Sequence, residues 1–375
     1  MPEDVTIWPV AMTKRGGILG SRSNRIPAYI AAAGNDTVEY PEVAPDGLDF
    51  TLEEYRCFTF YVNSRSNGTL QGPTETGDGS KENPFCNLNS IFSSNKFLCY
   101  IQNFCCQYVK VIITGTIDYY IDGRGRNFAK KLILDFHTAL IINWSKEKHG
   151  LSVTVVQNCV GVVFSNFEFT TAINHSKTQS DGQVDIYTYC FSGCTNCIFY
   201  NNTGEIRMKN NVSGTGANDH AALYVEYFKG CSGARILDTR ITVDMHSTGT
   251  ETGDSDCPIS HTRTAVVYGS SNVIIIGSRF NVTCKSTSND HTTGSDSFVT
   301  AIAQAFGLYS CSGAILSQTS ISCSAKATGD HYAKSDIACA LGTTAQYHNC
   351  SFSPSSIDNN GTNHWTSSYS FTCYK

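Results

Sequence analysis

The sequence predicts an all-β protein, a parallel β-helix with three short strands in each coil. One observation is a motif that recurs six times, with spacings of 35, 37, 39, 41 and 31 residues. The other is an apolar period of two residues within each copy, which is typical of strands. Periods of this size indicate a solenoid or another repeat architecture. The copies are anchored at Cys159, Cys194, Cys231, Ser270, Cys311 and Gly342.

Each copy repeats the same pattern around its anchor. An apolar residue stands three positions before it, and Gly or Asn stands two positions after it in five copies. These two residue types tolerate the left-handed conformation of a tight turn. In the third copy the pattern predicts strands at 222–228, 234–237 and 239–245. A β-propeller would need four antiparallel strands over about 40–50 residues, whereas the apolar part of each copy covers about 20.

The composition agrees with a turn-rich β protein. The chain has 375 residues, 41% of them hydrophobic, with 31 Gly and 9 Pro. A net charge of -5 gives no basic footprint for nucleic acid, and no apolar run is long enough to span a membrane. The first residues lack the pattern of a signal peptide. We therefore expect neither a nucleic-acid partner nor membrane insertion.

The seventeen cysteines predict a ladder of buried thiols. Free Cys behaves as a small buried hydrophobe, and an odd number in a long chain is not typical of a disulfide scaffold. Disulfides in part of the chain are the alternative. The C-x-x-C at Cys194 and Cys197 lacks a second pair of ligands, so we expect no metal site and no cofactor. Cysteines at the motif's inward positions are Cys159, Cys194, Cys231, Cys311, Cys323, Cys339 and Cys350.

The repeat divides the chain into three parts. Residues 1–56 lack the repeat and are interpreted as an N-terminal attachment or capping segment, because an open solenoid end exposes strand edges. Residues 57–352 form the predicted β-helix. Residues 353–375 are expected to add a C-terminal strand or cap. Within the β-helix, residues 58–62 are predicted as a strand and residues 88–93 as a short helix.

The entry to the repeat region resembles a known superfamily. It contains Tyr61-Val62, then Gly77-Asp78-Gly79-Ser80, then Asn83-Pro84-Phe85. This order is similar to the entry segment of right-handed β-helix proteins of the pectate-lyase-like superfamily. The resemblance covers about 35 residues and implies a right-handed coil, which the repeat spacing alone does not determine.

Polar stretches between the copies are interpreted as long loops on one side of the solenoid, at 172–183, 205–220, 246–262, 285–298 and 325–335. Stacked loops would form an extended surface for a hydroxyl-rich ligand such as a polysaccharide. Alternatively, their Asp and Ser residues only terminate turns. Asp181 with His175 belongs to the first loop. The predicted ligand-binding residues are Asp219, His220, Asp254, Asp256, His261, Asp290, His291, Asp330 and His331.

Catalysis is left open by the sequence. Glycoside hydrolysis usually uses two carboxylates about 5–9.5 Å apart. The polygalacturonase-like branch of the superfamily carries Asn-Thr-Asp, paired Asp, Gly-His-Gly and Arg-Ile-Lys motifs, and none is intact here. The catalytic candidates are Asp219, Asp254, Asp256 and Asp290.

The chain also resembles bacteriophage tail fibre and tailspike proteins. This resemblance implies a virion appendage, outside the cell, that binds bacterial surface polysaccharide. It further implies a homotrimer and attachment to other tail proteins through the N-terminal segment. The alternatives are a polysaccharide-degrading hydrolase or lyase, and a purely structural virion component.

Overall fold

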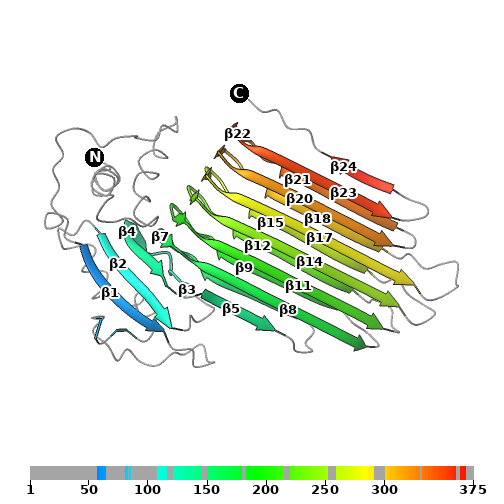
Figure 1. Cartoon of the computed structure of the whole chain (residues 1–375), viewed down its shortest axis with the longest axis horizontal. Helices are drawn as coiled ribbons and strands as arrows, with labels where there is room; N and C mark the ends of the chain where they lie inside the picture. The colour runs from blue at the N-terminus through cyan, green and yellow to red at the C-terminus, as the bar shows by residue number, and fades with distance from the viewer. Residues whose placement is uncertain are drawn as a thin grey trace.

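The computed structural model of the chain contains only strands and turns in the residues that it describes, with no helix among them (Figure 1). Within these residues there is also no helix that would be long and apolar enough to cross a membrane. The described residues are 57–64, 81–82, 84–85, 108–115, 121–137, 139–144, 150–179, 183–214, 220–251, 259–290, 300–329, 332–359 and 364–368.

The strands stack in parallel into three sheets, each of which takes one strand from successive coils. Sheet A comprises β1 (Cys57–Ser64), β2 (Tyr108–Gly115), β4 (Asn127–Phe136), β7 (Val160–Ser165), β10 (Ile198–Tyr200), β13 (Arg235–Leu237), β16 (Ile274–Ile276), β19 (Ala314–Ser317) and β22 (Ala345–His348).

Sheets B and C contain the longer strands, which Figure 1 shows side by side in chain order. Sheet B comprises β3 (Ile121–Asp122), β6 (Gly150–Gln157), β9 (Gln183–Ser192), β12 (His220–Lys229), β15 (Ile259–Tyr268), β18 (Thr300–Tyr309), β21 (Tyr332–Leu341) and β24 (His364–Ser368). Sheet C comprises β5 (Ala139–Trp144), β8 (Glu168–Gln179), β11 (Thr203–Gly214), β14 (Arg240–Glu251), β17 (Arg279–Asp290), β20 (Ser320–Gly329) and β23 (Ser351–Asn359).

This arrangement confirms the parallel β-solenoid and its three strands per coil. The sequence motif also predicts the register, because Phe228 before the third anchor pairs with Phe191 and Val267 in the neighbouring coils. Ile241, ten residues after the anchor, pairs in the same way with Gly204 and Phe280. Residues at equal positions of the motif therefore lie on top of one another along the solenoid.

The sixth copy keeps the predicted register after its anchor, since Tyr347 pairs with Leu316, but the residue in the anchor's place is one position later than the predicted Gly342. Leu341 pairs with Tyr309, whereas Ala345 pairs with Ala314, so this last turn is one residue shorter than the turn before it. Thr343, not Gly342, takes the anchor's role, because its Oγ1 donates to the carbonyl of Leu341 at 3.1 Å. Thr343 therefore keeps the anchor's distance from the strand that precedes it, and the missing residue lies between the anchor and the strand that follows.

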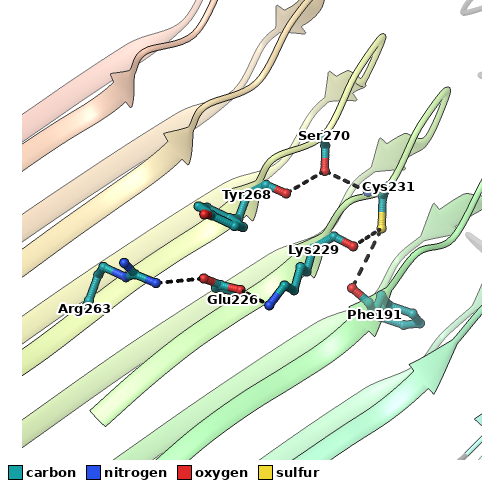
Figure 2. Close-up of polar contacts among 7 residues, drawn as sticks. All are labelled: Phe191, Glu226, Lys229, Cys231, Arg263, Tyr268 and Ser270. Atoms are coloured by element: carbon teal, nitrogen blue, oxygen red, sulfur yellow. Dashed lines mark hydrogen bonds and ion pairs between the residues drawn. The ribbon is translucent and has the colours of Figure 1, made fainter. Parts of the chain in front are cut away.

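The anchor residues are small because they close the turn from inside. Cys231 Sγ donates to the carbonyl of Lys229 at 3.7 Å, and Ser270 Oγ donates to that of Tyr268 at 3.1 Å (Figure 2). Ser270 Oγ also accepts the backbone N–H of Cys231 at 2.9 Å. The predicted left-handed residues two positions after the anchor are confirmed at Gly161, Asn196, Gly233, Asn272 and Gly313, with φ between 52° and 63°.

The interior is filled by stacked apolar side chains. The rings of Phe191 and Phe228 lie one above the other, 5.4 Å apart between centroids. Gly204 is the one weak position of the motif because the ring of Tyr227 fills its space. The thiol ladder is confirmed where side chains are described: the ten cysteines there are free, nine are buried, and Cys350 is half-buried.

Much of the sequence predicted as polar loops is strand, which corrects the loop assignment. Strands β8, β11, β14 and β17 each continue for 12 residues. The inward positions near the C-terminal ends of β14 and β17 are small, such as Ser247, whose Oγ donates to the carbonyl of Ala221 at 2.6 Å. Thr262 Oγ1 and Ser286 Oγ lie 2.9 Å apart across the same interior. These hydroxyls join sheets B and C where large side chains would not fit.

Both ends of the repeat region contain predicted strands. The predicted strand at 58–62 is confirmed within β1, which pairs with β2. Near the other end, β23 pairs with β20, and β24 pairs with β21. Residues 1–56 and the predicted helix at 88–93 lie outside the described residues.

Candidate functional site

Of the predicted ligand-binding residues, only His261 has a described side chain. His220 begins β12 and Asp290 ends β17, and their side chains are not among those described. The other predicted residues lie outside the described ranges, and they are Asp219, Asp254, Asp256, His291, Asp330 and His331.

His175 was interpreted as a loop residue, and this is wrong. It lies on β8 with its side chain in the interior, 1% exposed, and its Nδ1 is 2.8 Å from Asn210 Oδ1. His175 therefore belongs to the polar part of the core. No group of three or more described His, Cys, Asp or Glu side chains is arranged to hold a metal ion.

His261 lies on the outer face of sheet B, within a surface that is rich in tyrosine. Alternation along β9 buries Ile186 and Thr188 and turns Tyr187 and Tyr189 outward. The same alternation in β12, β15 and β18 turns further aromatic, charged and polar side chains outward. We call this surface the tyrosine face, and its residues are Tyr187, Tyr189, Tyr224, Glu226, Lys229, His261, Arg263, Tyr268, Gln304 and Tyr309.

The tyrosine rings are placed by the register of the sheet. Tyr187 pairs with Tyr224 on the neighbouring strand, and their rings stack with centroids 4.6 Å apart and an interplanar angle of 11°. Tyr268 and Tyr309 pair between β15 and β18, with centroids 5.5 Å apart. All four rings are half-buried, so each keeps an exposed part.

Two cations lie against tyrosine rings of this face and share one carboxylate. The guanidinium of Arg263 is 5.3 Å from the ring centre of Tyr224, and Lys229 Nζ is 3.9 Å from that of Tyr189. Arg263 Nη2 donates to Glu226 Oε1 at 3.0 Å, and Lys229 Nζ pairs with Oε2 at 2.9 Å (Figure 2). The Glu226 side chain is only 4% exposed, so the two cations neutralise a charge that burial would otherwise penalise.

A second polar network crosses four strands through His261. Gln304 Nε2 donates to Asp336 Oδ2 at 2.9 Å, which leaves the amide oxygen of Gln304 to accept from His261 Nε2 at 3.0 Å. Neutral His261 then accepts from the Tyr224 hydroxyl at Nδ1, 3.1 Å away. Lys334 Nζ, 2.8 Å from Asp336 Oδ2, completes the row. The network fixes the His261 tautomer and the orientation of Tyr224.

A small apolar cluster supports the other tyrosines. Ala265, Phe306 and Ala338 are at most 2% exposed, and Tyr268 and Tyr309 pack against them. These three residues pair in the same row of sheet B as Glu226. The tyrosine face is therefore built on packed side chains rather than on single exposed rings.

Burial and charge raise the pKa values of ionisable groups on this surface, among them Tyr224 and Lys229, which keeps these groups in their usual protonation state. Burial raises the pKa of Tyr224 to about 12, with smaller contributions from Asp185 and Tyr187. Burial alone would lower the pKa of Lys229, but hydrogen bonding and attraction to Glu226 raise it overall. At neutral pH the face therefore presents neutral phenols beside charged, paired cations.

Sequence reasoning did not identify the tyrosine face because it searched the polar stretches between strands. The available signal was tyrosine at outward positions of consecutive strands: Tyr187, Tyr224, Tyr268 and Tyr309 all fall within the repeat. Aromatic residues also have high strand propensity, so the pattern alone does not distinguish a binding surface from a strand. Comparisons with protein-family models, with curated proteins and with solved structures find no match for this chain.

Proposed function

We propose that this protein is a carbohydrate-binding appendage of a virion and that its tyrosine face holds the polysaccharide. One observation carries the binding part of the proposal. Half-buried tyrosines occupy outward positions on four consecutive strands of sheet B, with charged and hydrogen-bonding side chains between them. The bacterial surface polysaccharide, the virion location and the attachment to other tail proteins rest on the resemblance to tail fibres and tailspikes.

The chemistry of the face suits a sugar chain. Tyrosine offers a flat apolar surface and a polar tip with little loss of conformational entropy. Sugar rings carry C–H faces that pack on such rings and hydroxyl groups that need donors and acceptors. Arg263 and Lys229, which are partly exposed, provide donors, while Gln304 and the tyrosine hydroxyls can both donate and accept. Because neighbouring coils repeat about every 4.8 Å, the surface can contact several sugar units of one extended chain.

The test is retention of the purified protein on a panel of bacterial surface polysaccharides, with polymer length measured in the same samples. We expect retention without shortening, and Tyr268→Ala should weaken it about tenfold, since one aromatic contact contributes about 0.5–1.5 kcal/mol beyond its buried area. Tyr61→Ala, which removes a half-buried tyrosine of β1 in sheet A, is the matched control. Equal retention by Tyr268→Ala and the normal protein would overturn the assignment of the face.

The polymer-length measurement separates the other functions. Shortened chains with new ends would show a hydrolase or lyase and direct attention to Asp219, Asp254, Asp256 and Asp290. Neither retention nor shortening across the panel would favour a purely structural component. Both outcomes contradict the proposed adhesin-type role.

The homotrimer is a separate part of the proposal and has its own test. Analytical ultracentrifugation of the full chain should give three times the chain mass of 40.9 kDa. A species of one chain mass at micromolar concentration would contradict the trimer. Because each tyrosine contact described above lies within one chain, a monomer would leave the binding assignment intact.

A further inference from the structure

A row of basic side chains crosses the outer face of sheet C, on a different sheet from the tyrosine face. Lys209 on β11 pairs in register with His246 on β14. His246 pairs with Lys285 on β17, and Lys285 pairs with Lys326 on β20. We call these four residues the basic row. Strand spacing places neighbouring members about 4.8 Å apart between backbones.

The positive charge of the basic row is largely uncompensated by its surroundings. Lys209, Lys285 and Lys326 are exposed and His246 is half-buried. Within the part of the chain that the structure describes, none of the three lysines forms an ion pair, whereas Arg207 on the same face pairs with Glu205. The acid beside the row is Asp244, which precedes His246 by two residues. Like charges held one coil apart repel one another, and that repulsion would be relieved by an anionic ligand.

The face as a whole differs in charge from the chain. The described outward side chains of β11, β14, β17 and β20 include two acids, Glu205 and Asp244, although the chain carries a net charge of -5. The basic side chains of the same strands, apart from His246, are Arg207, Lys209, Arg240, Arg279, Lys285 and Lys326. A local excess of cations on an acidic protein favours an anionic ligand at this face.

We propose that the basic row binds a linear anionic glycan, whose carboxylate or sulfate groups lie along the solenoid axis. A glycan that lies in this direction contacts one basic residue in each of four consecutive coils. The site is independent of the tyrosine face, because its residues lie on sheet C and the tyrosines on sheet B. It adds a charged class of ligand to a protein whose proposed main surface is aromatic.

The residues beside the basic row favour a glycan over a nucleic acid. Two residues further along each strand lie Asn211, Thr248, Thr287 and Thr328, which are in register with one another. Hydroxyl and amide groups beside a cation can bind the hydroxyls of a sugar. The described outward side chains of β11, β14, β17 and β20 include no Phe, Tyr or Trp, so this face lacks the large stacking platforms on which single-stranded nucleic acids are held.

His246 makes the basic row sensitive to pH. Burial, followed by the charges of Lys285 and Lys209, lowers the pKa of His246, while Asp244 raises it. Arg207 and Asp244 are the charged groups of the adjacent column, and Lys209 and Lys285 flank the imidazole on either side. His246 is therefore mostly neutral at pH 7, and a bound polyanion would favour its protonated form. Binding should tighten as the pH falls from 7 to 5.

The experiment measures binding of the full chain to polygalacturonate, heparin, neutral dextran and single-stranded oligothymidine. We expect binding to at least one of the two anionic glycans and none to dextran. Lys209→Gln/Lys285→Gln/Lys326→Gln should weaken it about tenfold or more, because each charge contact adds a modest increment that high salt screens. The matched control, Lys81→Gln/Arg124→Gln/Arg126→Gln, removes the same charge from positions outside sheet C, two of which are exposed.

Each outcome decides the proposal. A preference for polygalacturonate or for heparin identifies carboxylate or sulfate as the recognised group, and His246→Gln should remove the gain in affinity at pH 5. Equal losses in the row variant and in the control variant would overturn the site, as would tighter binding to oligothymidine than to either glycan. Tyr268→Ala should leave this binding unchanged, so failure of the tyrosine face and failure of the basic row are distinguished.

Discussion

At the scale of single residues, Glu226 is the most constrained charge on the tyrosine face. Its side chain is 4% exposed, whereas those of Arg263 and Lys229 are 30% and 36% exposed. Removing a cation leaves a buried carboxylate without one partner, while removing the carboxylate leaves cations that still reach water. The two ends of this ion pair should therefore respond differently to substitution.

We expect Arg263→Met to lower the free energy of unfolding by about 1–2 kcal/mol, after allowance for the partial exposure of Arg263 and for the remaining Lys229. Glu226→Gln should cost less. Urea denaturation of both variants and of the double variant would give a coupling energy of about 1 kcal/mol. The exposed Glu205–Arg207 pair is the control, with an expected coupling below about 0.5 kcal/mol. Equal coupling in the two pairs would contradict the importance of burial.

Gly204 tests a steric explanation at one position of the motif. A Cβ at this residue would lie 2.5 Å from Cε2 of Tyr227 and 2.9 Å from Cδ1 of Ile241. Gly204→Ala should therefore lower the free energy of unfolding by about 1–3 kcal/mol through overpacking. The cost should shrink in a Tyr227→Leu background, where the ring is absent. A cost that is the same in both backgrounds would show that the Tyr227 ring is not the reason for glycine here.

At the scale of the repeated turn, the anchor combines small size with a weak donor. Cys231→Ser keeps a donor for the carbonyl of Lys229, as Ser270 does in the next coil, and should cost less than about 1 kcal/mol. Cys231→Val adds bulk and removes the donor, so it should cost about 1–3 kcal/mol. Thermal denaturation would rank them, and a valine variant as stable as the serine variant would contradict the role of the donor.

Burial within a strand explains the chemical state of a thiol on β17, that of Cys284. Burial raises the pKa of Cys284 to about 12, although hydrogen bonding with Thr264 and Thr262 opposes the shift. A thiol with so little thiolate at neutral pH is a poor nucleophile. Cys284 should thus resist alkylation in the folded protein and react after denaturation, which mass spectrometry of iodoacetamide-treated samples can measure.

The strands show where sequence reasoning succeeds and where it does not. Apolar residues at a period of two identify the strands near each anchor, and Gly or Asn identifies the left-handed turns. The outer halves of β14 and β17 carry Ser247, Gly249 and Ser286 at inward positions. The alternation of apolar and polar residues is therefore lost there, although the strand continues. These stretches resemble loops in sequence because the space between sheets B and C admits only small side chains.

At the scale of the whole molecule, the repeat predicts which residues pair with one another in successive coils. This follows because each coil stacks on the next in the same register. A residue at a fixed distance from its anchor pairs with its counterparts in the next coils, as Ile236 does with Phe199 and Ile275. The repeat alone does not predict the candidate sites. Residues that pair along the solenoid form a surface only if their side chains point to solvent, and this direction comes from the structure. Tyr187 and Tyr224 each stand seven residues before an anchor, so the repeat predicts that they pair, but the structure is needed to show that both side chains point outward.

The central claim is that polysaccharide lies on the tyrosine face, and hydroxyl-radical footprinting tests it most directly. The protein would be oxidised with and without a polysaccharide that retains it, and the modification of each tyrosine would be measured by mass spectrometry. We predict protection of Tyr187, Tyr224, Tyr268 and Tyr309, with Tyr61 unchanged. Unchanged modification of these four tyrosines, together with protection elsewhere on the chain, would contradict the claim.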